Sequence, residues 1–546
     1  MKTNKYNRYI SAALISLVLA GTTSCVSDLN TSPLSPSEKT SGNVFGNEEG
    51  AYISSLAKIY AGMAIGGNQG GDAEQDVAGI DGGSQASFLR VLWNMQELPT
   101  DMAHCAWSDP GIPGFNMISW GADSPWIKGS YYRMYYQVNL ANAFLRETTE
   151  EKLLERACSS ELIAKINAYR AEARFLRALN YTYLLDLYRN VPLVTEQSPI
   201  GEKVLPEQAT PQALFGFIET ELLAVEGNIR NASVGYSQEY GHATKAAVWA
   251  LLSRLYLNAE VYTGQAKYTE SITYSKKVIG AGFNLESNYA DMFKADNHLS
   301  EEMIFPVRYE GDQTMTWGGM TAFLCWGSAD LKDDVNAKDA WQGVRAKSSL
   351  LRLFEKESSS GDDTRKTMLH TDLTKNIEIV DQSSFKDNGI PVAKYCNKNK
   401  DGSLPPSKEA YVDFPLLRLG EVYLNYAEAV LRNGQGGDKA TAIGYVNDLR
   451  KRAYSDEAKA VIGEQDFNLD FILDERGREL FYEAQRRTDL IRFGKFTTSA
   501  YLWPWKGGIA EGKAVGDHLN IYPLPSDEIG SNTNLNQNTG YQTNLK

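Results

Sequence analysis

Residues 164–188, AKINAYRAEARFLRALNYTYLLDLY, carry the periodicity that decides the fold. Apolar side chains recur at helical spacing along this stretch, which predicts one long α-helix. The helix should end near Asn190-Val191-Pro192, because a proline cannot continue it. Small side chains at Ala171 and Ala178 let a second helix approach closely, and Phe175 can fill the gap between the two. The stretch therefore predicts a helix packed against another helix.

The same three residues follow the A-x3-F-x2-A spacing of the second helix of a tetratricopeptide unit. Further helical segments recur at irregular intervals, which indicates a degenerate repeat with long loops inserted between helical pairs. Strand signals are weak, so the predicted fold class is mainly α. The other predicted helices are 129–147, where Tyr131, Tyr132, Tyr135 and Tyr136 recur with helical periodicity, the pair 243–262 and 268–279, the pair 416–432 and 441–454, and a charged amphipathic helix over 471–493.

The first 25 residues have the layout of a targeting segment. Lys2, Lys5 and Arg8 form a basic start, and an apolar run of about eleven residues leads through small residues to Cys25. A helix of that length reaches only ~17 Å, too short for a hydrocarbon core of about 30 Å. Residues 1–24 are therefore predicted to be a signal peptide rather than a membrane span. Cys25 resembles a lipobox cysteine, whose thiol is acylated; the alternative is an ordinary secretory signal followed by an incidental cysteine.

The rest of the chain divides into a short polar segment and one large body. Residues 25–50 are rich in Ser, Thr, Pro, Asn and Gly and are predicted to form a lipidated tether and docking segment. Residues 51–546 are predicted to form a single domain. Removing residues 1–24 takes away three positive charges and no negative ones, so the net charge of −13 becomes −16. Such an acidic chain is unsuited to bind a nucleic-acid backbone.

Cysteine and histidine patterns give no sign of a metal site or a cofactor. Cys105, Cys158, Cys325 and Cys396 form no C-x-x-C motif, and the five histidines lack the spacing of known zinc sites. We therefore expect no metal and no cofactor, and interpret the histidines as surface or capping residues. The histidines are His104, His242, His298, His370 and His518.

With these blocks in place, the chain resembles the SusD/RagB family of nutrient-binding lipoproteins of the Bacteroidetes. Several short blocks in the family's order carry the resemblance over essentially the whole mature chain. They are Gln96–Asp101 (QELPTD), Arg174–Leu179 (RFLRAL), Phe414–Glu421 (FPLLRLGE), Arg486–Gly494 (RRTDLIRFG), Tyr501–Gly508 (YLWPWKGG), Tyr522–Pro525 (YPLP) and Asn536–Tyr541 (NQNTGY).

The resemblance implies a SusD-like fold with four tetratricopeptide-like helix pairs as a scaffold and long inserted loops that carry the ligand site. It also implies a lipid-anchored protein on the outside of the outer membrane, which captures oligosaccharides for a SusC-type TonB-dependent transporter. In the starch-binding founder of the family, an aromatic arc carries the ligand. By resemblance its members fall here on Trp107, Trp317 and Trp341, with Trp317 in place of a tyrosine. The founder's polar partners fall on Arg90 and Asp81, and near Asp109, where this chain has an acid instead of an amide.

The physical case for such a site is independent of the resemblance. A neutral pyranose has an apolar face of C–H groups, which an aromatic ring matches, and a rim of hydroxyls that polar side chains can bind. The alternative for each tryptophan is a role as a plug in the core. Trp326, Trp503 and Trp505 lie in apolar or scaffold blocks and are interpreted as core, and Tyr236 and Tyr240 as surface tyrosines.

The charged segment 471–493 leaves a rival hypothesis open. Glu475, Glu479 and Glu483 fall on one face of the predicted helix, and paired carboxylates could serve a glycoside hydrolase. Ion pairs between neighbouring helical turns are the simpler interpretation. No nucleophile elbow, phosphate loop or dinucleotide motif is present, so no catalytic residue is predicted. A second rival is a transporter lid or assembly subunit without glycan affinity of its own. The sequence does not name the sugar; starch or another α-glucan is the first hypothesis.

Lipidation of Cys25 can be tested directly. We expect Cys25→Ala to abolish palmitate labelling and to leave the chain soluble or uncleaved, because the variant lacks the thiol that would be acylated. Labelling and membrane fractionation of the wild type and variant measure this. A variant that stays labelled and membrane-bound would place the anchor elsewhere.

Overall fold

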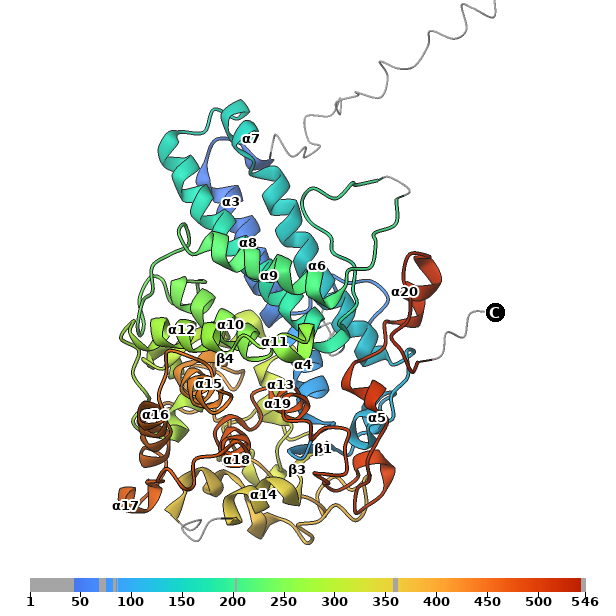
Figure 1. The fold of residues 1–546 in the computed structure, drawn as a ribbon, viewed down its shortest axis with the longest axis vertical. Helices are drawn as coiled ribbons and strands as arrows, with labels where there is room; N and C mark the ends of the chain where they lie inside the picture. The colour runs from blue at the N-terminus through green and yellow to red at the C-terminus, as the bar shows by residue number, and fades with distance from the viewer. Residues whose placement is uncertain are drawn as a thin grey trace, which may run out of the picture.

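The computed structural model describes residues 44–67, 75–81, 85, 87–201, 204–356 and 362–541. The predicted signal peptide, Cys25 and most of the predicted tether lie outside these residues. The described chain is mainly helical, which confirms the predicted fold class (Figure 1). In its first half the elements are α3 (Glu49–Ala64), α4 (Phe88–Glu97), β1 (Ala103–Cys105), α5 (Ile112–Met117), α6 (Pro125–Glu147), α7 (Glu150–Glu155), α8 (Ser160–Tyr188), α9 (Pro211–Val225), α10 (Lys245–Leu257), α11 (Ala259–Thr263) and α12 (Tyr268–Ile279).

The second half contains more loop and shorter helices. Its elements are β2 (Met303–Val307), α13 (Met320–Cys325), β3 (Val344–Ala346), α14 (Ser348–Glu355), β4 (Phe414–Arg418), α15 (Leu419–Leu431), α16 (Lys439–Lys451), α17 (Glu457–Ala460), α18 (Leu469–Leu480), α19 (Arg486–Arg492) and α20 (Ser526–Ser531), with short 3-10 helices between them.

The stretch that opens the sequence analysis forms α8, the longest helix of the described chain. Its start is fixed by Ser159, whose side chain accepts a hydrogen bond from the Leu162 amide at 3.2 Å. The helix ends before Arg189, which adopts a positive φ of 60°. Ala171, Phe175 and Ala178 are all buried, and α8 packs against α6 on one side and α9 on another. The predicted close helix packing is confirmed.

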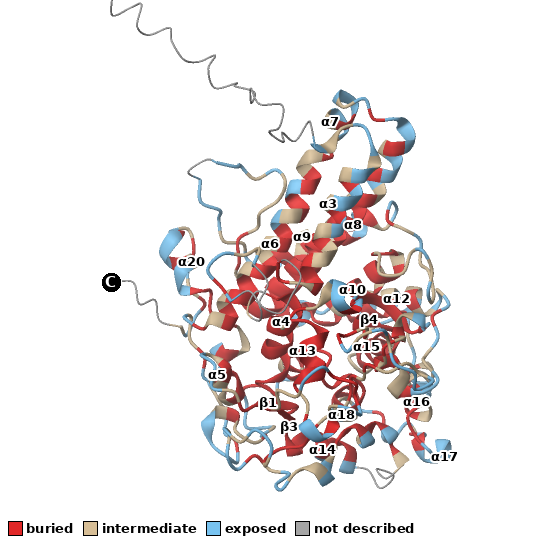
Figure 2. Ribbon diagram, turned by 180° about the vertical axis from the view of Figure 1, so that it is seen from behind, coloured by how far each residue is buried: buried red, intermediate tan, exposed pale blue. Residues whose placement is uncertain are grey.

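The other predicted pairs also pack together, although the predicted helix 243–262 is divided at Asn258 into α10 and α11. α10 packs on α12, α12 on α15, and α15 on α16. Figure 1 shows α3, α6 and α8 extending together at the upper end of the molecule, with α7 at their tip. Helices α10, α12, α15 and α16 lie below them, in the left half of the view. The largest cluster of buried apolar side chains runs from Tyr52 to Leu535, and Figure 2 shows these buried stretches facing inward along the helices.

Two small antiparallel sheets connect distant parts of the chain. β1 pairs with β3, with Ala103 opposite Ala346 and Cys105 opposite Val344. β2 pairs with β4, with Met303 opposite Arg418. The predicted helix over 416–432 therefore begins as a strand, and α15 starts only at Leu419. Burial of Phe414–Arg418 in a ladder explains the difference, because a short apolar run fits a buried strand as well as a helix.

The predicted helix over 471–493 is wrong in its middle. It is split into α18 and α19 by residues 481–485, where Tyr482 and Ala484 have φ of 64° and 59°. The prediction that its glutamates pair along the helix is also largely wrong. Of the three arginines that pair with Glu475 in the described residues, Arg478 lies on the same helix, whereas Arg365 and Arg450 reach it from other segments.

These carboxylates belong to a fully buried network centred on Arg418. The Arg418 guanidinium binds Glu302 and Glu479 at 2.7 Å each and Glu483 at 2.6 Å. All three carboxylates have fully buried side chains. Their negative charges hold the pKa of Arg418 well above its usual value despite burial. The network therefore connects three segments that are distant in sequence: β4, α18 and the residues just before β2.

We expect Glu479→Gln to lower the free energy of unfolding by about 3–5 kcal/mol, because it leaves buried arginines without their counter-charge. Asp474→Asn on the same helix is the matched control. Among the described residues Asp474 pairs with Lys356, whose side chain is 49% exposed, so that change should cost under about 1 kcal/mol. Urea unfolding of both variants measures the difference. Equal losses in the two variants would contradict the central role of the buried network.

Candidate functional site

The structure brings the three predicted tryptophans together on one surface, here called the tryptophan arc (Trp107, Trp317 and Trp341). The Trp317 and Trp341 rings meet edge to face with centroids 5.1 Å apart, and Trp107 lies 6.2 Å from Trp341. All three side chains are partly exposed. Trp107 and Trp341 also pack against the main cluster of buried apolar side chains.

The β1–β3 ladder positions two of the three rings. The Ala106 amide donates to the Gly343 carbonyl at 2.9 Å, which extends the pairing to the residues beside Trp107 and Trp341. Gly343 has a φ of 95°, and a Cβ there would overlap the Trp107 indole. Glycine is therefore needed at this position both for the backbone and for the close approach of the ring.

Helix α13 fixes the other side of the arc. Trp317 lies just before this helix, and the Trp341 amide donates to the carbonyl of Cys325 at the end of it, at 2.7 Å. Lys338, which the sequence analysis missed, places its Nζ 5.8 Å from the Trp317 ring and pairs with Glu409. Its position three residues before Trp341 is the only sequence signal that could have identified it.

Arg90 on α4 lies beneath the arc rather than in front of it. Its guanidinium carbon is 5.3 Å from the Trp107 ring and 5.2 Å from Trp126, and its Nη1 donates to the Trp317 carbonyl at 2.9 Å. Only 7% of the residue is exposed. Burial lowers its pKa to about 10, which leaves it charged at neutral pH. Arg90 is thus a clamp that holds two tryptophans, with little surface left for a ligand.

Asp81 and Asp109 lie near Arg90, and both are exposed. Their negative charges partly oppose the fall in the pKa of Arg90, which places them within electrostatic range of its guanidinium. The structure thus gathers all six predicted site residues in one region: three rings at the surface, one buried cation and two exposed acids.

The other predicted aromatic and histidine roles have mixed outcomes. Trp326 and Trp503 are buried, as predicted, and Trp326 forms the layer under Trp107 at 6.4 Å. Trp505 is only half-buried, and its Nε1 donates to the Ile379 carbonyl at 2.6 Å. The surface interpretation is wrong for His104, which is 2% exposed and donates to the Gln382 carbonyl. That burial lowers the pKa of His104 to about 4.

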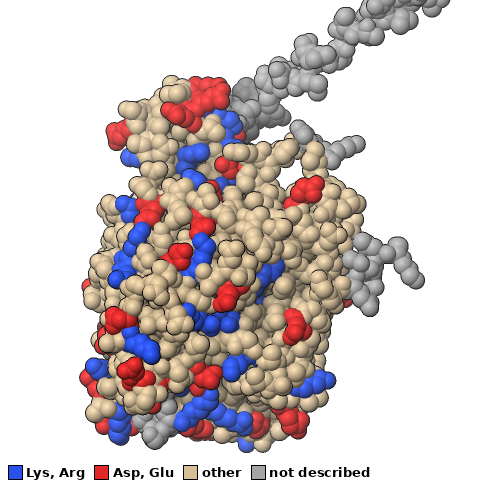
Figure 3. Space-filling view, viewed as in Figure 1, with Lys and Arg blue, Asp and Glu red and all other residues tan. Residues whose placement is uncertain are grey.

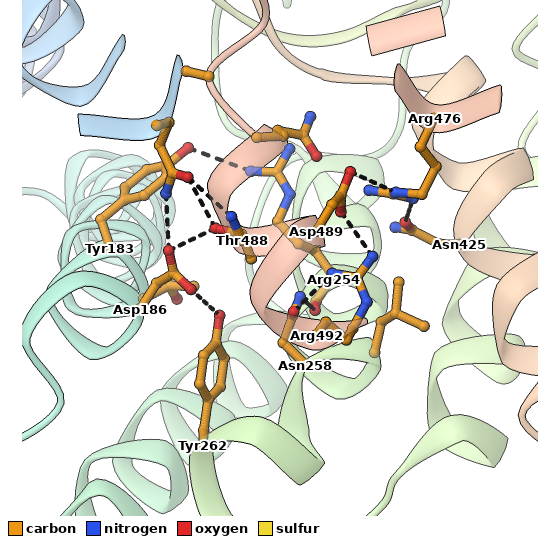
Figure 4. A pocket seen from close by; sticks show the side chains of 15 residues that line it. Tyr183, Asp186, Arg254, Asn258, Tyr262, Asn425, Arg476, Thr488, Asp489 and Arg492 are labelled. Atoms are coloured by element: carbon orange, nitrogen blue, oxygen red, sulfur yellow. Dashed lines mark hydrogen bonds and ion pairs between the residues drawn. The ribbon is translucent and has the colours of Figure 1, made fainter. Parts of the chain in front are cut away.

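A small hollow lies between α8, α10 and α19 (Figure 4). The polar side chains that line it hydrogen-bond to one another. Asp186 accepts hydrogen bonds from Gln96, Tyr262 and Thr488. The free volume is only about 30 Å³, which is room for water rather than for a sugar. These side chains hold helices together.

Neither a membrane span nor a metal cluster is found in the described part of the chain. No helix in these residues combines the length and the apolar character that crossing a membrane requires. No group of three or more His, Cys, Asp and Glu side chains is placed there to hold a metal ion. Figure 3 shows positive and negative side chains interspersed over one face, between wide uncharged areas.

This arrangement defines a mainly α-helical protein that brings three tryptophans together at its surface. The SusD family profile matches residues 380–541, and a profile described as starch-binding associating with outer membrane matches residues 116–257. The starch-binding protein SusD of Bacteroides thetaiotaomicron is 34% identical, over 99% of this chain and 100% of that protein. The chain belongs to the SusD family, as the sequence blocks indicated.

Solved structures of the superfamily share this fold. A surface glycan-binding protein A from Bacteroides fluxus aligns with a TM-score of 0.67 and 20% identity, over 90% of this chain and 100% of that one. A laminarin-binding SusD-like protein aligns with a TM-score of 0.68 and 22% identity, over 91% and 100%. At this identity the alignments show the fold alone.

The packing of Gly343 against Trp107 gives a test of how the arc is built. We expect Gly343→Ala to cost about 2–4 kcal/mol of stability and to displace Trp107, because strain at positive φ and an overlap with the ring add together. Gly402→Ala is the control, since Gly402 has a φ of 85° with open space around it; it should cost about 1–2 kcal/mol. Unfolding measurements and quenching of tryptophan fluorescence by acrylamide compare the two. Identical stability and quenching would contradict the described packing.

Proposed function

We propose that this protein captures oligosaccharides at the cell surface by stacking sugar rings on the tryptophan arc. The observation that carries the proposal is the meeting of three partly exposed indoles on one rigid surface. A stacked pyranose would bury C–H groups against each ring, and Asp81, Asp109 and Lys338 stand at the edge to accept or donate hydrogen bonds. Starch or another α-glucan is the preferred ligand, since the relative that is 34% identical is named a starch-binding protein.

The cellular role we propose follows the family. Residues 1–24 act as the signal peptide, acylated Cys25 anchors the chain to the outer membrane facing outward, and residues 25–50 form the tether. Residues 51–546 act as one glycan-binding domain that delivers its ligand to a SusC-type TonB-dependent transporter. The family profile described as associating with the outer membrane supports this location. A lid or assembly subunit without glycan affinity is the alternative.

Replacing Trp107, Trp317 or Trp341 by Ala should weaken oligosaccharide binding by roughly 1–2 kcal/mol each, from lost ring contact and burial. Folding should survive, because each ring is partly exposed. Isothermal titration calorimetry with maltotriose and thermal melting, on the same variants, measure both effects. Trp249→Ala is the control, as Trp249 is half-buried on α10 and donates to Glu226. A large fall in melting temperature with native affinity in the folded fraction would contradict the proposal, and a wild type that binds no glycan would favour the alternative.

We also expect the purified protein to release no reducing ends from starch, fructan or mannan. The carboxylates that could suggest a hydrolase, Glu475 and Glu479, are 0% exposed and are held by arginines. A glycosidase needs its acid and its nucleophile or base on either side of a sugar. A reducing-sugar assay at high protein concentration tests this, with heat-denatured protein as the blank. Activity that scales with folded protein would restore the hydrolase hypothesis.

A further inference from the structure

Five residues of α6 form one wall of an open hollow, here called the tyrosine hollow. They are the three partly exposed rings of Tyr132, Tyr135 and Tyr136, the buried Tyr131 and the exposed Asn139, and they face Glu528 and Asn532 of the α20 region. Its volume is about 540 Å³, within the range of small-molecule sites. Figure 1 shows the two elements that supply these residues, α6 and the α20 region. The spacing of these residues along α6 puts the three rings on neighbouring turns.

The rings of the hollow are held in place before any ligand arrives. The Tyr135 hydroxyl donates to the Pro192 carbonyl at 2.5 Å, and its ring lies 4.7 Å from the buried Tyr131. Burial and the nearby negative charge of Glu528 raise the pKa of the Tyr132 hydroxyl. Tyr132, Tyr135 and Tyr136 are all partly exposed. Rings that are fixed but accessible lose little conformational entropy when a ligand stacks on them.

The polar groups around the hollow are carboxylates and amides. Asp76 and Glu528 place carboxylates at its wall, and Asn139 and Asn532 add amides. Burial raises the pKa of Glu528 above its usual range, and Asp76 is paired with Arg133 and Lys58. Carboxylates and amides beside aromatic rings suit a neutral polyhydroxyl compound, whose hydroxyls can donate to them.

Two features connect the tyrosine hollow to the tryptophan arc. Trp126, which lies 5.2 Å from the Arg90 clamp, begins the same helix. Tyr132 and Tyr136 follow it by ~9 Å and ~15 Å along the helix axis at 1.5 Å per residue. In addition, Asp76–Ala78 line the hollow, and Asp81 lies within electrostatic range of Arg90. Helix α6 therefore runs from the residues beneath the arc to those that line the hollow.

We propose that the tyrosine hollow is a second carbohydrate subsite, which takes a further stretch of the neutral glycan chain held on the tryptophan arc. The proposal rests on the glycan binding proposed above and extends it. A short oligosaccharide occupies the arc alone, whereas a long chain contacts both surfaces. The second contact is intramolecular once the first has formed, so weak stacking in the hollow still raises the affinity for long chains.

The test compares maltotriose with soluble amylose on the intact mature chain. We expect Tyr132→Ala and Tyr136→Ala to weaken amylose binding roughly threefold to tenfold each, from the loss of one stacked ring, and to leave maltotriose binding unchanged. Trp317→Ala should weaken both ligands. Tyr236→Ala is the control, because Tyr236 is 63% exposed and lies outside both surfaces. Asn139→Arg, at an exposed position, blocks the hollow without removing a ring and should act like the tyrosine variants.

The outcomes separate the proposal for the tyrosine hollow from the proposal for the tryptophan arc. Unchanged amylose affinity in Tyr132→Ala, Tyr136→Ala and Asn139→Arg, with Trp317→Ala impaired, overturns the hollow and leaves the arc intact. A wild type that binds neither ligand overturns both. Hollow variants that keep amylose affinity but lose association with a co-expressed transporter would make the hollow a protein contact instead. If the tyrosine variants fail to fold, Asn139→Arg alone carries the comparison.

Discussion

The structure depends on a group of buried charges around Arg418. Moving an arginine and three carboxylates out of water is costly, and their mutual attraction offsets this only if every partner is in place. Glu302, Glu479 and Glu483 must therefore meet one guanidinium from different segments. Lys394 adds a further contact to Glu483 at 2.6 Å. The positive φ at Tyr482 follows from this constraint, since the chain must turn after α18 for Glu483 to reach Arg418.

The same turn supports the tryptophan arc from below. The Tyr482 carbonyl accepts a hydrogen bond from the Trp93 indole at 3.1 Å. Trp93 contacts Trp326 with centroids 4.8 Å apart, and Trp326 in turn lies under Trp107. A continuous path of packed groups thus leads from the charged interior to the surface rings. Loops positioned by a rigid interior can present side chains in one arrangement, which lowers the entropy lost when a flat sugar face is bound.

The sequence predicted the scaffold well and the interior poorly. The helix 268–279 matches α12 at both ends, because a full amphipathic pattern specifies a helix locally. The prediction of one continuous helix over 471–493, with ion pairs along it, was wrong. In the sequence, charged residues look the same whether they face water or pair with Arg418, and only tertiary contacts distinguish the two cases. The arc tryptophans were located through family resemblance, as spacing along the chain cannot bring residues 107, 317 and 341 together. The clamp formed by Arg90 could not be foreseen, since a single arginine carries no periodicity.

Charged and aromatic side chains occupy different parts of this molecule, and this separation affects how a ligand could be held and released. The ion pairs around Arg418 lie inside, where they fix the scaffold, while the two surfaces proposed to bind ligand consist of aromatic rings with a few polar groups beside them. Each ring contact is worth only about 0.5–1.5 kcal/mol beyond burial, and no strong charge pair must be broken when a neutral chain leaves. Several weak contacts along a chain add to a useful affinity for polymers, yet each breaks quickly by itself. That combination favours a protein that retains long chains at a surface and passes them on.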